Sequence, residues 1–256
     1  MIDHRLSGKH LISLGVLVAA IIVASIQPLE MQSYLLHQTG TLFMIGMLIF
    51  CLYKIGLSFL SFNLYILFLF IHIVAAHYLY SYVPYNDWIQ TLFGFDLNAL
   101  IGWSRNMFDR FVHLVFGLLL YPVFYRLFQV WLPQQKPFTI FLLVIQFVMA
   151  TSLIYEWIEW LIAIGLSPEQ AESYNGQQGG MWDAHKDILL ATVGAMFTAG
   201  IKDLDFIFSY FKLWKWAISL PIIFHFLQFI TRQYLAVINI IGGIGILNLM
   251  CVHNST

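Results

Sequence analysis

Residues 137–164 read PFTIFLLVIQFVMATSLIYEWIEWLIAI, an apolar stretch whose only formal charges are those of Glu156 and Glu159. About 20 apolar residues are enough for a helix to cross a bilayer, so this stretch can span a membrane. Its apolar residues run continuously instead of alternating with polar ones, which indicates a helix rather than a strand of a membrane barrel. One charged side chain inside such a segment costs about 2.5–3.5 kcal/mol on insertion scales, so the two glutamates mark a site or a paired network.

The composition of the whole chain indicates the same environment. Of its 256 residues, 60% are hydrophobic and 10% are charged, whereas a soluble domain has about 25% charged residues. The formal net charge of −1 gives no sign of a nucleic-acid partner, and two cysteines are too few for a disulfide framework or a thiolate metal motif. We therefore expect an all-α, polytopic transmembrane helical bundle whose partners are membrane lipids.

Apolar stretches of bilayer length recur along the chain. They cover residues 11–27, 40–56, 58–82, 107–127, 137–164, 185–202, 213–231 and 234–252. Arg232 and Gln233 leave almost no loop between the last two, so the tail holds either two spans or one span and an interfacial helix. The sequence thus predicts six to eight spans, six of them in a domain over 1–203 and the rest in an extension over 204–256. We expect the first span to be an uncleaved anchor.

The distribution of lysine and arginine predicts the orientation. If the spans alternate, eight basic residues fall on one side: Arg5, Lys9, Lys54, Arg126, Lys136, Lys202, Lys212 and Lys215. The other side receives Arg105, Arg110 and Lys186, together with ten of the thirteen acidic residues. Cytoplasmic loops carry the excess of basic residues, so the N-terminus is predicted to be cytoplasmic. The loops at 28–39, 83–106 and 166–184 then face the periplasm.

Three segments place ionisable side chains at this outward end of three different spans. They contain Asp109, Arg110 and His113, then Glu156 and Glu159, then Asp183 and Asp187. Spacings of three or four residues put such side chains on one helical face. Charges that merely cap their own helices or reach the headgroups would be scattered over both ends of the spans. We expect instead that the seven residues line one cavity, and that Gly117, on the face of His113, lets a neighbouring helix come close.

The formal charge of this cluster indicates what would neutralise it. Its five acids, offset by Arg105, Arg110 and Lys186, leave two negative charges. A divalent cation would cancel them, and oxygen ligands with one imidazole suit Mn, Zn, Fe or Mg. The expected ligands are His113, Glu156, Glu159 and Asp187. Two protons would cancel the charge equally well. Arg110 would then either orient a carboxylate or receive an anionic group such as phosphate.

The same three segments resemble the YjdF family of bacterial inner-membrane proteins, whose function is unknown. The family's motifs read here as Asn106 with Asp109-Arg110-x-x-His113, Tyr155-Glu156-x-x-Glu159-Trp160, and Gln178-Gly179-x-x-Trp182-Asp183-x-x-x-Asp187. The resemblance covers residues 11–203 and implies a multi-pass protein of the bacterial inner membrane. Gly180 stands where relatives often carry an acid, so the role of that acid is not available to this chain. A fainter similarity to VanZ-like proteins, which are associated with glycopeptide-antibiotic resistance, points to the cell envelope.

Three functions are compatible with these features. The cluster can be a binding or catalytic site, open to the periplasm and outer leaflet, for a lipid-linked or anionic envelope substrate. A proton- or cation-coupled transporter would need polar residues that continue to the cytoplasmic face, but the stretches 118–120 and 138–148 are nearly free of them. The cluster can also be structural and only pin helices together. The sequence contains no His-Glu-x-x-His or Gly-x-Ser-x-Gly motif, so it specifies no reaction.

Overall fold

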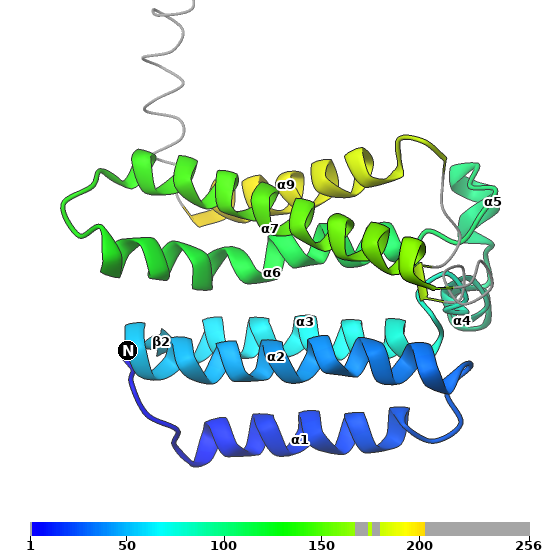
Figure 1. Cartoon of the computed structure of the whole chain (residues 1–256), viewed down its shortest axis with the longest axis horizontal. Coiled ribbons are helices and arrows are strands. Elements are labelled where there is room, and N and C mark those ends of the chain that lie inside the picture. Colours follow the sequence, from blue (N-terminus) through cyan, green and yellow to red (C-terminus); the bar gives the residue numbers. More distant parts are fainter. Residues whose placement is uncertain (1, 167–173, 176–179, 203–256) are drawn as a thin grey trace, which may run out of the picture. The chain divides into compact units, whose positions relative to one another are not determined.

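The computed structural model describes residues 2–166, 174–175 and 180–202, and the spans predicted at 213–231 and 234–252 lie outside this part. The chain divides into two units, Met1–Lys202 and Asp203–Thr256. In the described part of the first unit, long helices run side by side with alternating direction (Figure 1). They are α1 (Gly8–Ala24), α2 (Met31–Ile55), α3 (Phe59–His77), α6 (Phe108–Trp131), α7 (Pro137–Gly165) and α9 (Asp183–Lys202).

Four of these helices, α2, α3, α6 and α7, are long and apolar enough to cross a membrane. Helix α1 is a shorter apolar helix, and α9 carries Asp183 and Asp187 in its first two turns. The prediction of an all-α, multi-pass membrane protein is therefore confirmed. Its orientation in the membrane and the helices of the 204–256 extension stay predictions.

The helices form two groups that meet along α3 and α6. Figure 1 shows α1, α2 and α3 on one side and α6, α7 and α9 on the other, with α3 packed against α6. Leu52, Phe62 and Leu120 belong to the apolar core that joins the first group to α6. Val144 and Ala195 belong to a second core, which joins α6 and α7 to α9. This second group positions the candidate site.

The N-terminus is attached to the connection between α2 and α3. Strand β1 (Ile2–Asp3) pairs antiparallel with strand β2 (Leu57–Ser58). Asp3 also forms an ion pair with Lys9, with 2.7 Å between Oδ2 and Nζ. These contacts bring Lys9 to the same end of the helices as Lys54, which is the grouping of basic residues that alternating spans predicted.

The second helix begins earlier than the sequence predicted. Helix α2 starts at Met31 instead of residue 40, so most of the expected 28–39 loop is helical. The carboxylate of Glu30 accepts hydrogen bonds from the backbone nitrogens of Gln32 and Ser33 at 2.9 and 2.5 Å, which caps the helix. His37 is polar but buried in the bundle. Ser33 and Gln38 are buried as well, so these polar residues face protein rather than water, and their polarity misled the prediction.

The third span and the loop after it also differ from expectation. Helix α3 ends at His77 rather than at residue 82. The predicted 83–106 loop contains two short helices, α4 (Tyr85–Phe93) and α5 (Leu97–Ile101). Gly94 and Gly102, with φ angles of 78° and 77°, end these helices in the left-handed conformation that glycine adopts readily.

Single cysteines would test the predicted orientation. In a background lacking Cys51 and Cys251, we expect Gln90→Cys in α4 to react with an impermeant maleimide in intact cells. Gln134→Cys, in the turn between α6 and α7 at the opposite end of the helices, should react only after lysis. The reverse pattern would place the N-terminus in the periplasm.

Candidate functional site

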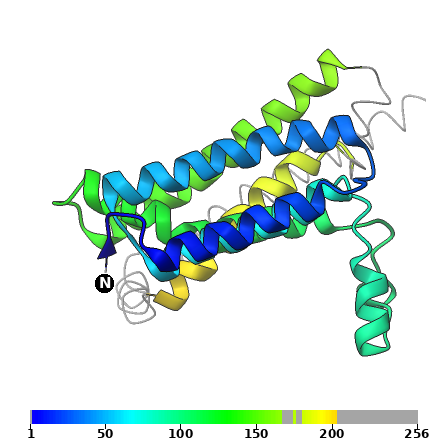
Figure 2. The ribbon, with the colours of Figure 1, turned by 90° about the horizontal axis from the view of Figure 1, so that it is seen from below.

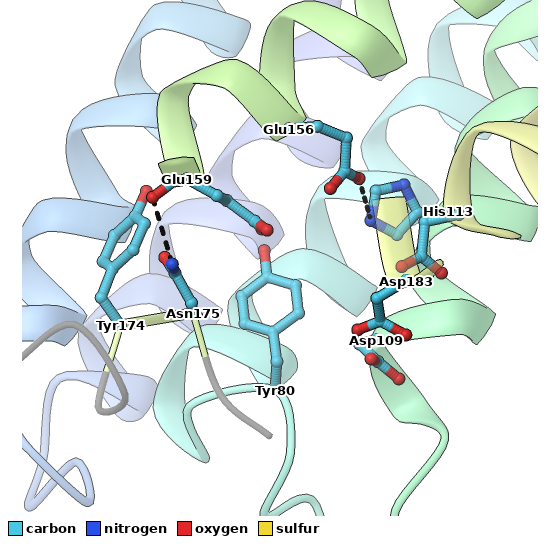
Figure 3. A pocket seen from close by; sticks show the side chains of 9 residues that line it. Tyr80, Asp109, His113, Glu156, Glu159, Tyr174, Asn175 and Asp183 are labelled. Atoms are coloured by element: carbon cyan, nitrogen blue, oxygen red, sulfur yellow. Dashed lines mark hydrogen bonds and ion pairs between the residues drawn. The ribbon is translucent and has the colours of Figure 1, made fainter. Parts of the chain in front are cut away.

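A small cavity lies where the start of α6, the end of α7 and the start of α9 meet (Figure 3). It is lined by Tyr80, Asp109, His113, Glu156, Glu159, Tyr174, Asn175, Asp183 and Asp187. Its volume of about 20 Å³ suits one water molecule or a small ion. Six of the seven residues predicted from sequence therefore share one cavity. The seventh, Arg110, does not line it but contacts two of its carboxylates.

A close crossing of α6 and α9 sets the distance between two walls of the cavity. A Cβ atom added at Gly117 would lie 1.8 Å from the carbonyl oxygen of Ala191, and one added at Gly194 would lie 2.1 Å from a backbone oxygen of α6. The hydroxyl of Thr198 donates a hydrogen bond to the carbonyl of Leu118 at 2.6 Å. The two backbones therefore touch, and the close approach predicted at Gly117 is confirmed.

Two arginines bind three of the carboxylates. Arg110 Nη2 donates to Asp183 Oδ1 at 2.6 Å, and Arg110 Nε lies 3.9 Å from Asp187 Oδ1. Arg105 contacts Asp109 at 2.9 Å and Asp183 at 3.1 Å. Arg110 therefore orients carboxylates, which is one of the two roles that the sequence allowed. Arg105, which the sequence analysis counted only as a charge, joins the start of α6 to α9.

Three ionisable side chains, one from each of α6, α7 and α9, converge as metal ligands do. Donor atoms of His113, Glu156 and Asp187 lie within 4.8 Å of one another. Asp109, Asp183 and Asp187 form a second such group, but arginines hold Asp109 and Asp183 at 2.6–3.1 Å, whereas the contact of Arg110 with Asp187 is 3.9 Å. His113 Nε2 lies 3.6 Å from Glu156 Oε1 (Figure 3). Among the described residues, Glu156 Oε1 and Asp187 Oδ1 are buried and accept no hydrogen bond, and the contact of Asp187 Oδ1 with Arg110 Nε is a long one of 3.9 Å. A cation could approach both oxygens more closely.

Glu159, which the sequence predicted as a metal ligand, belongs to neither group in the described part of the chain. Its side chain points toward the hydroxyl of Tyr80 (Figure 3), and its backbone carbonyl accepts a hydrogen bond from Asn175 at 3.1 Å. Burial, and then the nearby Glu159, raise the pKa of Tyr174 to about 12. Three positions along a helix rotate a side chain by about 60°, which turns Glu159 away from Glu156 and toward these tyrosines.

The cavity is more acidic than the sequence suggested. Lys186 and His185 are both exposed, so neither contributes charge to the interior. Within the described ranges, five acids therefore face Arg105 and Arg110, an excess of three negative charges when all are ionised. Carboxylates this close inside a membrane require a bound cation or protons.

A second polar group adjoins the cavity and escaped the sequence analysis. The hydroxyl of Tyr80 is hydrogen-bonded to His72 Nδ1, and the ring of His37 stacks on that of Tyr174 with 4.2 Å between centroids. Both histidines are buried. His72 could have been identified from the sequence, because it interrupts an apolar run as His113 does. His37 lies in a stretch that was interpreted as a loop.

Comparison with known proteins agrees with these motifs. The family described as "Predicted membrane protein (DUF2238)" matches residues 9–204, which include all three segments of the cavity. The protein named "Inner membrane protein YjdF" of Escherichia coli (strain K12) is 26% identical over 182 residues, or 71% of this chain and 83% of that protein. No solved structure matches the chain. The family match extends over well more than half of the sequence, and the chain therefore belongs to the DUF2238 family of predicted membrane proteins.

Proposed function

We propose that this protein binds a divalent cation in the membrane-embedded cavity and uses it to act on an anionic, lipid-linked or envelope substrate. The observation that carries the proposal is the convergence of His113, Glu156 and Asp187, whose donor atoms lie within 4.8 Å of one another. Asp187 is 4% exposed, and a buried carboxylate oxygen without a hydrogen bond is costly unless a cation or proton meets it. One imidazole with two carboxylates favours Zn, Fe or Mn over Mg, which prefers oxygen ligands.

The remaining residues have roles that fit this arrangement. Arg105 and Arg110 hold Asp109 and Asp183 by ion pairs, so these two carboxylates shape the site and are less available as ligands. Glu159 lies beside the tyrosine hydroxyls, where a carboxylate can exchange protons with a substrate. A bound cation supplies Lewis acidity. The cavity has room for the ion only, so the substrate's anionic group would approach the ion from the membrane surface.

The location supports an envelope substrate. The related Escherichia coli protein is named an inner membrane protein, and the spanning helices of this chain fit the same location. With the predicted orientation, the cavity opens at the periplasmic end of the bundle. Headgroups of phospholipids and lipid-linked envelope precursors lie at that depth and carry phosphate groups.

A transporter is less well supported than a site open to one side. The stretches 114–125, 137–155 and 188–201 of α6, α7 and α9 separate the cavity from Arg126, Lys136 and Lys202 at the opposite end of these helices, and they contain no Asp, Glu, His, Lys or Arg. A relay of protons or cations across the membrane needs such groups at successive depths. In the described parts of α6, α7 and α9, such groups lie toward the two ends of the bundle and are missing between them.

Metal binding to the purified protein tests the proposal. We expect the protein in detergent to bind about one Zn²⁺ or Mn²⁺ per chain in titration calorimetry. Replacement of a single ligand, in Glu156→Gln or Asp187→Asn, should weaken binding by about 100-fold or more, since even outer neighbours of metal ligands contribute about 10–100-fold. Asp87→Asn, an exposed carboxylate on α4, is the matched control and should bind as wild type does. Wild-type protein without affinity for any of these ions, or variants with unchanged affinity, would refute the cation site.

Isosteric neutralisation separates a functional site from structural pinning. We expect Glu159→Gln and Asp187→Asn to keep the wild-type melting temperature in detergent, because each variant retains shape and hydrogen-bonding capacity. Both should fail to complement a deletion strain under envelope stress. If the cluster only pins helices, the variants should instead melt well below wild type or complement fully.

A further inference from the structure

Helix α4 has the sequence pattern of a helix that lies at a membrane surface. Tyr85, Trp88, Ile89 and Leu92 follow the i, i+3, i+4, i+7 spacing of one apolar stripe. The opposite face carries Asn86, Asp87, Gln90 and Thr91. Within this helix no residue is buried, so the apolar stripe is not part of the protein core.

The apolar side of α4 and α5 is widely exposed in the described part of the structure. Leu92 and Phe93 are 74% and 70% exposed, and Leu100 in α5 is 74% exposed. Trp88 and Trp103 are exposed as well. Several large apolar side chains gathered in so short a segment indicate a surface that is covered in the native environment.

The direction of α4 and α5 indicates that the membrane covers their apolar side. Figure 2 shows α4 and α5 crosswise to the long helices, at the end of the bundle where the cavity lies. The long helices cross the membrane, so a segment crosswise to their ends runs along the membrane surface. The side chains of Trp157, Trp160 and Leu161, near the end of α7, are exposed as well, and tryptophan is enriched at the membrane–water interface.

Hydrogen bonds fix the two helices to each other and to the start of α6. The Tyr85 hydroxyl donates to Asn98 Oδ1 at 2.7 Å and accepts from the backbone nitrogen of Met107 at 3.1 Å. The backbone nitrogen of Asn98 donates to Asn86 Oδ1 at 3.0 Å. Met107 directly precedes α6, and Asp109 follows two residues later. The depth of α4 and α5 in the membrane therefore determines the depth of the start of α6, where the cavity lies.

We propose that residues 85–103 form an interfacial hairpin that rests in the leaflet on the cavity side and holds the cavity at headgroup depth. Trp88, Leu92, Phe93 and Leu100 enter the acyl region, while Asp87 and Gln90 face water. The segment contains no Lys or Arg, so apolar burial drives its insertion and anionic lipids are not required. A lipid-linked substrate that diffuses in this leaflet would meet the cavity beside the hairpin.

Site-directed fluorescence in vesicles tests the hairpin independently of metal binding. Single cysteines at Leu92, Phe93, Leu100, Asp87 and Gln90, in full-length protein lacking Cys51 and Cys251, are labelled with bimane and reconstituted into phosphatidylcholine vesicles. Probes at Leu92, Phe93 and Leu100 should be quenched strongly by spin-labelled lipid and at least fivefold less by aqueous iodide than the probe at Gln90. Gln90 and Leu92, which are two positions apart on opposite faces of α4, serve as each other's matched controls.

Three outcomes would overturn the proposal. Equal iodide quenching at Leu92 and Gln90 would mean that water covers both faces. Protection of Leu92 and Leu100 from both quenchers would mean that protein, either another part of the chain or a second copy, covers the surface. Lipid quenching that appears only when phosphatidylglycerol is added would show electrostatic recruitment rather than apolar insertion. A failure of metal binding leaves these measurements unaffected, because the labelled positions lie outside the cavity.

Discussion

We expect Gly117→Ala to destabilise the protein by about 3 kcal/mol, the upper part of the usual penalty for overpacking a core. The new Cβ atom would lie 1.8 Å from the carbonyl oxygen of Ala191 and 2.8 Å from the backbone nitrogen of Ala195. These neighbours are backbone atoms, so no side chain can rotate away, and α6 and α9 must separate. Because Asp187 lies one turn before Ala191, the same displacement should also weaken cation binding. Unfolding by denaturing detergent, followed through tryptophan fluorescence, measures the first effect.

The matched control is the same substitution in another membrane-length helix. Gly46 lies within α2, and a Cβ atom there would meet nothing within 4 Å. Alanine is favoured over glycine in a helix interior by about 1 kcal/mol, so Gly46→Ala should be neutral or slightly stabilising. If glycine-to-alanine substitution destabilises the protein at position 117 but not at position 46, the contact between α6 and α9 is the cause. Equal stability of the two variants would show that the crossing is loose enough to absorb a methyl group.

The sequence was sufficient to predict the four described helices that are long and apolar enough to cross a membrane, and six of the residues that line the cavity. A continuous apolar stretch such as 137–164 crosses lipid as a helix, because a helix satisfies all its backbone hydrogen bonds internally. An ionisable residue inside such a stretch is costly and therefore usually has a function. Alternating direction then brings Asp109, Glu156 and Asp187 to one end of the bundle. For the same reason, Gly117 could be recognised as a contact before its partner, the backbone of Ala191, was known.

The features that escaped prediction depend on tertiary contacts. His37 lies in a polar stretch, and only its packing against Tyr174 shows that the stretch is buried helix rather than loop. Glu159 has the chemistry of a metal ligand, but its direction follows from the rotation of α7 relative to the cavity. Lys186 is adjacent to Asp187 in sequence, yet its side chain is exposed. Composition identifies such groups, whereas the direction of each side chain depends on how the helices pack.

The two arginines stabilise the acidic cluster inside the fold, so replacing one of them should substantially lower the free energy of unfolding. Arg110→Met preserves a long apolar stem but deletes the guanidinium that contacts Asp183 at 2.6 Å and Asp187 at 3.9 Å. Breaking a buried ion pair by removing one partner costs about 3–5 kcal/mol, because an uncompensated charge remains. Since Arg105 still contacts Asp183, we expect a loss of about 3 kcal/mol, at the low end of that range.

A double variant distinguishes this electrostatic cause from lost packing. Arg110→Met combined with Asp183→Asn removes both the cation and one of the charges that it balanced, so the double variant should be more stable than Arg110→Met alone. Lys186→Met, an exposed basic residue on α9, is the control and should change stability by less than about 0.5 kcal/mol. If the two substitutions lower the free energy of unfolding additively, Arg110 and Asp183 do not stabilise each other. Arg110 would then stabilise the protein through the packing of its apolar stem. If the double variant regains stability relative to Arg110→Met, the carboxylates themselves destabilise the fold and the arginines offset this cost. That result is expected when acidic residues are kept for binding a cation rather than for stability.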